Sequence, residues 1–464
     1  WTSPAGAIQE SGAPITVFDC VFTRPPSKEA PVRVDGDLRG GRVFLSNNKA
    51  EGCTEIVNFS TNEFRKANIF DVPVGTAGGV IKSAQQRFLR SKVRIPGKVF
   101  DAKRDFGAKG DGLTDDSEAI QKTIDAARAH GRDAIAYLPR GHYTVSQTLK
   151  LTGRDYFFGG CGYLSVLGWK KGVVGGTILA IENPQNLTVE NISVSEEGNG
   201  FNATNDIDIL QTGTGQPSSI CYDRVQVYGI YKNKPLVKGL QLKNLGEGDV
   251  VNINEIEGNV RCIDSARATI LLRLSYEGSI VVEGAKPERG GFIGGCVRLS
   301  TSADPGLWLK DNQSIVMSDC YTESGTQFIR MEGNAALPPG RVTIQGAKFE
   351  IANKENNAVD VSNYHGELFV GPYNYYVGNP LHRFVHRGDA PFLLTVWGGS
   401  FYNSKPEFKL GNTARLIVAG CRSPGDTVES SVKDVGTAQA LPALARAFDD
   451  MRRLGEVEMK LNAE

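Results

Sequence analysis

The sequence predicts an all-β protein built as a parallel β-helix, a solenoid in which short strands stack coil upon coil. Short strand-like segments of similar grammar repeat along most of the chain, and no second amphipathic helix is available in each repeat. That pattern favours a parallel β-helix over an ankyrin or leucine-rich array. A further repeat, about 300 residues apart, indicates that the chain opens in the closing coils of a first β-helix.

The distant repeat sets the domain plan. The segments ITVFDCVFT and GGRVFL, within residues 15–45, match SIVMSDCYT and PGRVTI, within residues 314–344. A shared order of strand, polar corner and strand indicates one supersecondary unit used twice. We therefore divide the chain into terminal coils of a first β-helix (1–60), a crossing segment (61–100), a second β-helix (101–425) and a C-terminal helical tail (426–464).

One helix is predicted at the start of the second β-helix, over about residues 116–129. Asp115 and Glu118 are spaced as a capping pair at its start, and Gly131 ends it. Its apolar face is formed by Ile120, Ile124 and Ala127. The strands 134–138 and 142–145 follow. We expect this N-terminal capping helix to cover the otherwise open first coil. We interpret Asp111, Asp115 and Asp116 as capping and turn groups rather than a metal cluster.

Beyond residue 176 the chain divides into units of a short strand, a corner and a second strand, most of them of the length expected for solenoid repeats. They include VVNINEIEGNVRCID, TILLRLSYEGSIVVEG, SIVMSDCYTESGTQFIRMEG, RVTIQGAKFEIANKENNAVDVSN, ELFVGPYNYYVGNPLHRFVHR and LLTVWGGSFYNSKPEFKLGN.

Composition excludes several partners. Lys plus Arg and Asp plus Glu are equal at 52 each, so no basic field favours nucleic acid. The sequence has no run of 18 apolar residues, so it predicts no membrane span. No signal peptide is visible either; if the protein is secreted, on the cell surface or periplasmic, we expect its leader to lie upstream or to have been removed. The 8 cysteines have no metal-ligand spacing and are interpreted as buried thiols, with a disulfide or two as the alternative. We expect no cofactor and no metal; the oligomeric state stays open.

Aligned coils supply candidate site residues. Four glutamates occupy the same place just before a corner, and two tyrosines continue the column: Glu257, Glu277, Glu323, Glu350, Tyr376 and Tyr402. Stacked strands lie about 4.8 Å apart, so such carboxylates reach the separations of either glycosidase mechanism. As catalytic residues we choose Glu323 with Asp319 or Glu350. As substrate-binding residues we choose Glu277, Tyr276, Tyr321, Tyr376 and Tyr402. The alternative is a solvated polar ladder.

The strand LHRFVHR alternates in a second informative way. His382, Phe384 and His386 share one face, and Arg383 and Arg387 share the other. We expect one face to be packed and the other solvated, with binding of an acidic sugar by the arginines as the alternative.

The segments VFDAKRDFGAKGDGLTDDSEAIQKTIDAA and AYLPRGHYTV, within residues 99–145, carry a family resemblance. They resemble the opening segment of the pectate-lyase-like right-handed β-helix superfamily, which polygalacturonases, tandem β-helix β-1,3-glucanases and phage tailspikes share. The two-helix plan resembles family 55 glycoside hydrolases, exo-acting β-1,3-glucanases. The polygalacturonase set N-T-D, D-D, G-H-G and R-I-K is not present. Fold resemblance alone does not select the chemistry.

Three functions remain open. The first is a glycoside hydrolase that cleaves a β-glucan-like polysaccharide with two carboxylates. The second is a polysaccharide lyase on a uronic-acid polymer, which needs a base and a group that neutralises the uronate. Residues that could supply these are Tyr276, Arg273, Lys310 and Arg330. The third is a saccharide-binding or tailspike-like β-helix without catalysis. In each case the expected partner is a polysaccharide or oligosaccharide.

Overall fold

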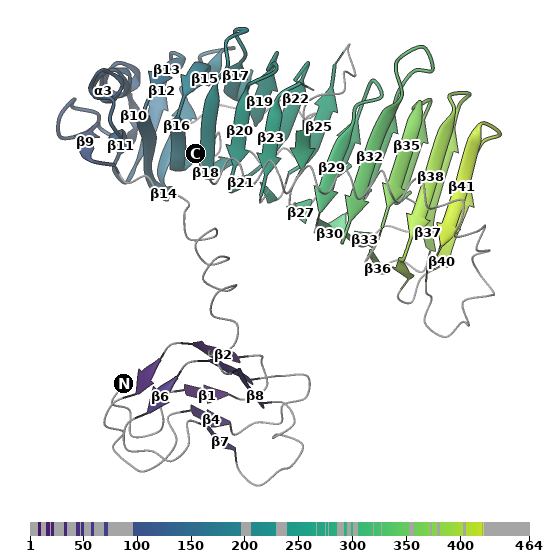
Figure 1. Cartoon of the computed structure of the whole chain (residues 1–464). Coiled ribbons are helices and arrows are strands. Elements are labelled where there is room, and N and C mark those ends of the chain that lie inside the picture. The colour runs from purple at the N-terminus through teal and green to yellow at the C-terminus, as the bar shows by residue number, and fades with distance from the viewer. Residues whose placement is uncertain are drawn as a thin grey trace. The chain divides into compact units, whose positions relative to one another are not determined.

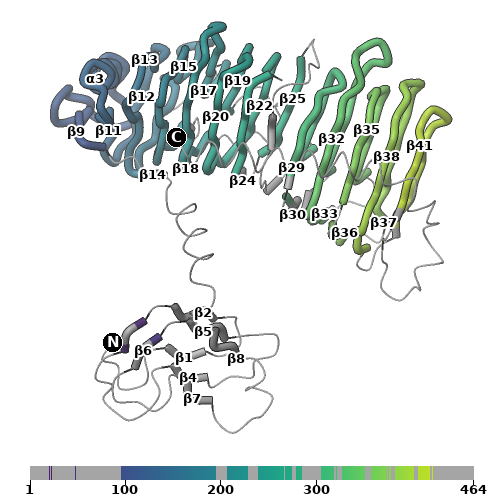
Figure 2. Tube along the Cα trace, viewed as in Figure 1, coloured from purple at the N-terminus to yellow at the C-terminus, as the bar shows by residue number. Residues whose placement is uncertain are grey.

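A computed structural model shows a β-helix (Figures 1 and 2). The residues that it describes are 8–10, 15–18, 20–22, 32–34, 43–46, 48–50, 57–59, 69–72, 96–195, 206–228, 239–284 without 266, 274 and 277, 292–294, 298–299, 305–351 without 319 and 326, 357–377 without 372 and 373, 381–401, 405–419 and 421. The chain divides into two units, Val93–Leu461 and Trp1–Lys92 with Asn462–Glu464. The division falls inside the predicted crossing segment 61–100.

From β20 (Val250–Ile253) onward each coil of the larger unit supplies three strands, one to each side of the solenoid. In one coil these are β32 (Gly340–Gln345), β33 (Lys348–Ile351) and β34 (Val359–Ser362). The next strand, β35 (Gly366–Val370), returns to pair with β32 in parallel. The parallel β-helix predicted from the sequence is therefore confirmed. The prediction of two strands per coil was wrong from β20 onward, because the short middle strand has little periodic signal.

We call the three sides faces A, B and C. Face A contains β9 (Lys98–Asp101), β11 (Ala134–Leu138), β20 (Val250–Ile253), β23 (Thr269–Leu272), β26 (Phe292–Gly294), β29 (Ile315–Ser318), β32, β35, β38 (Phe392–Trp397) and β41 (Ala414–Ala419). Face B contains β10 (Asp111–Asp115), β12 (Gly141–Val145), β21 (Ile256–Glu257), β24 (Ser275–Tyr276), β27 (Arg298–Leu299), β30 (Tyr321–Gly325), β33, β36 (Tyr375–Val377) and β39 (Ser400–Phe401).

Face C is one continuous sheet of 11 strands. It contains β13 (Leu149–Arg154), β15 (Thr177–Gln185), β17 (Ile207–Thr212), β19 (Leu240–Lys243), β22 (Val260–Ile263), β25 (Ile280–Glu283), β28 (Leu307–Leu309), β31 (Ile329–Glu332), β34, β37 (Leu381–Arg387) and β40 (Lys405–Lys409). The register shifts between β13 and β15. From β15 to β34 the strands keep one register, so side chains far apart in the sequence form straight columns across this face.

In the early coils, faces A and B are joined by long strands that bend: β14 (Tyr156–Trp169), β16 (Leu187–Ser195) and β18 (Ser219–Tyr228). Asn191 and Arg224 lie at equivalent places in two successive bends, with φ of 51° and 53°. Asparagine tolerates this left-handed conformation, which explains Asn191. Nothing in the structure explains the choice of arginine at 224.

The interior is filled by side chains from all three faces. In the later coils the rings of Phe328, Phe349, Tyr376 and Phe401 form a stack with successive centroid distances of 4.1, 4.6 and 4.2 Å. Phe349, Tyr376 and Phe401 are paired in register on neighbouring strands of face B. Stacked coils thus place like residues one above another, and ring stacking adds to the burial that stabilises the coils.

The helix α3 (Ser117–His130) covers the first coil and contacts β9, β11 and β13 (Figure 1). Ile120, Ile124 and Ala127 are fully buried, so the predicted apolar face is confirmed. Gly131 ends the helix at φ 57°. The capping pair differs from the expectation, because the N-cap is Asp116 and Glu118 instead pairs with Lys122 at 2.6 Å.

The smaller unit repeats the three-sided plan. Its strands are β1 (Ile8–Glu10), β2 (Ile15–Phe18), β3 (Val21–Phe22), β4 (Val32–Val34), β5 (Val43–Ser46), β6 (Lys49–Ala50), β7 (Val57–Phe59) and β8 (Ile69–Val72). They pair in parallel in three sets, β1-β4-β7, β2-β5-β8 and β3-β6. The strands β2, β3, β4 and β5 correspond in sequence to β29, β30, β31 and β32. β8 lies beyond residue 60, so strand pairing continues into the predicted crossing segment.

Candidate functional site

The predicted carboxylate column lies on face B, but the register divides it. Glu257 pairs with Tyr276 rather than with Glu277, and Glu350 pairs with Val377 rather than with Tyr376. A shift of one residue turns a side chain to the opposite face of a sheet. Glu277, Asp319 and Tyr402 lie outside the described residues. For Tyr276, Tyr321 and Glu323 the structure describes the strand and not the side chain.

Tyr376 is corrected by its burial. Its side chain is 0% exposed, and it stacks between Phe349 and Phe401 inside the coil. Burial raises its pKa well above the ordinary value. A ring in this position has no face to offer a sugar, so Tyr376 is a core residue and not a substrate-binding residue.

Glu323 lies at a bulge in β30. Thr322 pairs with Phe349, and Gly325 pairs with Ile351, so Glu323 and the following serine lie opposite the single residue Glu350. The carboxylate of Glu350 accepts a hydrogen bond from Lys348 Nζ at 2.6 Å. Bulges commonly change the direction of a side chain next to a functional site. The register therefore brings Glu323 and Glu350 to neighbouring strands.

A shorter polar line on face B crosses three coils. Ser193 Oγ donates to Gln226 Oε1 at 2.8 Å, and Gln226 Nε2 donates to Glu257 Oε2 at 3.0 Å. Each of these residues is in register with the next. The line fixes the amide and the carboxylate, as a polar ladder on a solenoid does.

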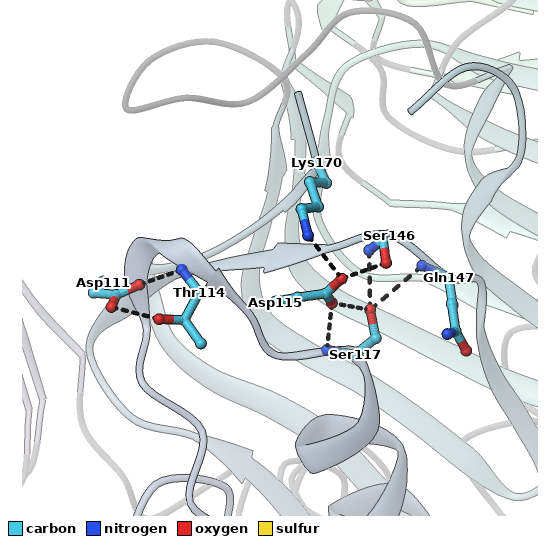
Figure 3. Close-up of polar contacts among 7 residues, drawn as sticks. All are labelled: Asp111, Thr114, Asp115, Ser117, Ser146, Gln147 and Lys170. Carbon is cyan, nitrogen blue, oxygen red and sulfur yellow. Dashed lines mark hydrogen bonds and ion pairs between the residues drawn. The ribbon is translucent and has the colours of Figure 1, made fainter. Parts of the chain in front are cut away.

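The acids near α3 have the structural roles expected for them (Figure 3). Asp111 accepts from the backbone and hydroxyl of Thr114, and these bonds together with that from the Leu113 amide lower its pKa to about 2. Asp115 accepts from Ser117 and Ser146 and lies 3.4 Å from Lys170 Nζ. Ser117 Oγ in turn accepts from the backbone of Ser146 and Gln147. Asp116, not drawn in Figure 3, accepts from the amides of Lys109 and Gly110 at 2.7 and 2.9 Å.

The strand β37 is packed on one side, as expected. His382, Phe384 and His386 are 1%, 0% and 3% exposed, whereas Arg387 is exposed. Burial lowers the pKa of His382 to about 4. The arginines pair with carboxylates of neighbouring coils, Arg383 with Glu407 at 3.0 Å and Arg387 with Asp360 at 2.8 Å. Face C therefore carries a ladder of ion pairs.

One part of face C differs from the rest of this ladder. Strand pairing aligns Arg261, Val281, Trp308, Arg330 and Asp360 in one column on the outer side of β22, β25, β28, β31 and β34. Within this column Val281 is covered and only 2% exposed. At the centre of the column lies Trp308, whose neighbours on either side in the sequence, Leu307 and Leu309, are buried. Alternation along a strand therefore turns the indole outward.

Two cations lie against the indole. Lys310 Nζ is 4.3 Å and Arg330 Cζ is 4.9 Å from the centre of the Trp308 ring. Among the described residues, Trp308 Nε1 is a buried donor without a hydrogen-bond partner. Both distances fall in the range of favourable cation–π contact.

A single carboxylate anchors one side of the cluster. Glu283 Oε2 accepts from Lys310 Nζ at 2.9 Å, and Glu283 Oε1 accepts from Arg261 Nε at 2.8 Å. Burial raises the pKa of Glu283, but the hydrogen bonds and charges of Lys310 and Arg261 outweigh this, and its pKa is lowered. Glu283 is 14% exposed and Lys310 27%, so this pair is held more firmly than Arg330 (46%) with Glu332 (31%), which are 2.6 Å apart.

We call Arg261, Glu283, Trp308, Lys310 and Arg330 the tryptophan cluster. An aromatic platform with cations around it suits a sugar ring that carries a carboxylate. Lys310 and Arg330 were visible in the sequence as charged candidates with no reason to join them, whereas Trp308, Arg261 and Glu283 carried no sequence signal that marked them as site residues. In the third strand of each coil, VRCI, IVVE, LWL and IRME stack with their second residues in one column, an alignment that the strand pairing reveals.

Three further properties of the described residues bear on the site. No group of three or more His, Cys, Asp or Glu in the described parts could hold a metal ion. No helix there is long and apolar enough to cross a membrane. Cys262 is a buried thiol, whose pKa burial raises to about 12, but Cys161 is exposed, contrary to the expectation for the cysteines.

Comparison with protein families gives one match. Residues 100–179 match the family described as "Rhamnogalacturonase A/epimerase, pectate lyase-like". This segment includes α3 and the first coils, and the match agrees with the resemblance to the pectate-lyase-like right-handed β-helix superfamily. The more specific resemblance to family 55 glycoside hydrolases stays a prediction.

Curated relatives match over short segments. Alginate lyase 7 of Azotobacter vinelandii is 33% identical over 141 residues, which cover 27% of this chain and 16% of that protein. Mannuronan C5-epimerase AlgE1 of the same organism is 60% identical over 50 residues, 11% of this chain and 3% of that protein. The matches thus span only a small part of these relatives.

Among solved structures, the A-module of the mannuronan C-5 epimerase AlgE6 of Azotobacter vinelandii aligns with 71% of this chain and 100% of its own. The identity is 17% and the TM-score 0.41. Tailspike protein 2 of Escherichia coli O157:H7 bacteriophage CAB120 aligns with 66% of this chain and 43% of its own, with 13% identity and a TM-score of 0.39.

Proposed function

We propose that this chain is a carbohydrate-active protein that binds an acidic polysaccharide at the tryptophan cluster and cleaves it by β-elimination at a uronate. The observation that carries the proposal is the position of Lys310 and Arg330 against Trp308, beside Arg261. Guanidinium groups bind carboxylates in a two-point geometry that lysine cannot match. The similarity to an alginate lyase supports this chemistry over the hydrolysis that the sequence analysis put first. We also propose that the chain acts on this polysaccharide outside the cell.

In β-elimination the C5–H bond of the uronate breaks and a base takes the proton. The electron pair forms the C4–C5 double bond, and the C4–O bond breaks with its oxygen leaving on the other sugar fragment, where it takes up a proton. Negative charge grows on the carboxylate as the proton departs, so cations placed beside it stabilise the transition state.

Within the tryptophan cluster we assign proton transfer to Lys310, which takes the C5 proton in its neutral amine form, after its ammonium proton has left to solvent. The ammonium so formed then supplies the proton that the leaving oxygen takes up. Arg261 and Arg330 do not lose a proton in proteins. The lowered pKa of Glu283 makes it a weak base, and its two oxygens already accept hydrogen bonds. Glu283 then holds Lys310 in place, and Arg330 receives the uronate carboxylate.

The test is a screen over alginate, polygalacturonate, glucuronate polymers and neutral β-glucans, in which ultraviolet absorbance of the unsaturated product and reducing ends are both followed. We expect both signals on a uronate polymer. Lys310→Arg keeps the charge and should bind the polymer but form no product. Lys243→Ala, on an exposed lysine of β19 on the same face, is the control and should keep full activity. Product from Lys310→Arg at the original rate would refute the assignment.

A second candidate is hydrolysis of a neutral β-glucan on face B. The pairing of β30 with β33 favours it, because the bulge in β30 leaves Glu323 opposite Glu350. Asp319 remains part of this proposal as an alternative partner of Glu323, and Tyr276, Glu277, Tyr321 and Tyr402 as substrate-binding residues. Reducing ends without new absorbance, lost in Glu323→Gln and Glu350→Gln, would support it. Binding without any product would support a non-catalytic saccharide-binding protein.

A further inference from the structure

Arg330 and Lys310 both contact the indole of Trp308, but their ion pairs differ in burial. Lys310 forms an ion pair with Glu283, which also accepts a hydrogen bond from Arg261. The side chain of Lys310 is 27% exposed and that of Glu283 is 14% exposed. Arg330 is 46% exposed, and its partner Glu332 is 31% exposed. Exposed pairs of this kind contribute little to stability and exchange readily with water. Arg330 is therefore the cation that can leave the ring.

A sugar ring needs a bare aromatic face in order to stack. At Trp308 two cations lie 4.3 and 4.9 Å from the ring centre, so a sugar can gain that face only when a cation moves away. Moving Arg330 loses its contact with the indole and loosens its ion pair with Glu332. A neutral sugar does not offset the free energy of these lost contacts, whereas a sugar carboxylate offsets it by binding the guanidinium through two hydrogen bonds.

We propose that Arg330 is a specificity-determining residue, a cover on Trp308 that a carboxylated sugar displaces and a neutral sugar does not. This inference rests on the proposed binding of an acidic polysaccharide at the tryptophan cluster and explains how that site rejects neutral chains. The energies of one exposed cation–π contact and one exposed ion pair correspond to a preference of about tenfold.

The experiment measures binding separately from catalysis. Short oligouronates and the same oligosaccharides with their carboxyl groups reduced to alcohols are titrated against the full chain. The signal is tryptophan emission, and Trp308→Phe identifies the share of Trp308 among the 4 tryptophans. The wild-type chain should bind the oligouronate at least about tenfold more tightly than its reduced form.

Arg330→Ala should bind the reduced oligosaccharide about tenfold more tightly than the wild type and the oligouronate more weakly, so that the preference disappears. Arg330→Lys should keep part of it. Arg154→Ala is the control, since Arg154 is also an exposed arginine of face C but lies on β13, far from Trp308 along the sheet, and it should keep the full preference. An unchanged preference in Arg330→Ala, or equal weakening of both ligands, would overturn the inference.

Failure of the proposed function has a different signature. If the preference behaves as expected but no unsaturated product ever forms, the specificity role of Arg330 is supported and the proposed elimination reaction is refuted. If the wild-type chain forms that product and Arg330→Ala keeps the preference for the oligouronate, the elimination reaction is supported and the specificity role of Arg330 is refuted.

Discussion

The carboxylate of Glu283 lies 2.9 Å from the ammonium of Lys310, and each residue ends or follows a strand of face C in a neighbouring coil. Arg261, one coil earlier, donates to the same carboxylate. One partly buried acid thus links three successive coils and fixes one edge of the tryptophan cluster. Its loss should affect both the stability of the solenoid and binding at the site.

Glu283→Gln should lower the free energy of unfolding by about 1–2 kcal/mol, because two cations lose a partly buried partner. Urea unfolding at neutral pH measures this. The pKa of Glu283 is lowered in the folded chain, so its contribution is present above the ordinary pKa and is lost as pH falls through the folded value. The difference from the variant should therefore shrink in acid. Glu332→Gln, in the more exposed pair, should cost less than about 0.5 kcal/mol; equal costs would contradict the argument.

Trp308→Ala should weaken binding of oligouronates at least about tenfold, because the aromatic platform is lost. Trp308→Phe should lose less, since a ring remains. Isothermal titration with the short oligouronates measures both affinities. Trp397→Phe is the control, because this partly exposed tryptophan lies on β38 of face A, away from the cluster. A normal affinity in Trp308→Ala would place binding elsewhere.

Tyr376→Phe should raise the free energy of unfolding by about 1 kcal/mol, because the Tyr376 hydroxyl is buried without a hydrogen-bond partner among the described residues. Tyr364 is its matched control. It is equally buried, but its hydroxyl donates to Gln313 O at 2.7 Å, so Tyr364→Phe should cost about 1 kcal/mol. Changes of the same sign in the two variants would show that this hydrogen-bond difference does not govern stability.

His382 should make the fold sensitive to mild acid. Its pKa falls to about 4 in the folded chain because it is buried, while the unfolded chain has the ordinary value near 6.5. The unfolded state then binds the extra proton first, so stability falls as pH drops from about 6.5 to about 4, by about 3 kcal/mol in total. Chemical unfolding at a series of pH values should show this slope, and His382→Leu should flatten it. A slope unaltered by the substitution would contradict the assignment.

Periodic patterns made the fold predictable. The helical spacing of Ile120, Ile124 and Ala127 located α3, and the alternation of β37 separated its packed histidines from its solvated arginines, because both depend on local spacing alone. The coil repeat predicted the solenoid for the same reason. The short strands of face B carried no such period, so Tyr376 was placed one residue out of register and assigned to the surface rather than to the core.

The candidate site was less predictable for a related reason. Trp308 and Arg330 are neighbours because β28 and β31 keep register across a corner and a face, while the connections between coils vary in length. A residue's column can therefore be read only when every strand of the coil is known. Lys310 and Arg330 were visible as charged residues, but their shared contact with one indole depends on the tertiary structure.

Because each coil bonds chiefly to the coil before and the coil after, gain or loss of one whole turn leaves the inward and outward sides of every remaining strand unchanged. Residues 15–45 and 314–344 show that this chain has used one such module at two places. Evolution can therefore lengthen or shorten the surface on either flank of Trp308 in steps of about 4.8 Å without redesigning the interior.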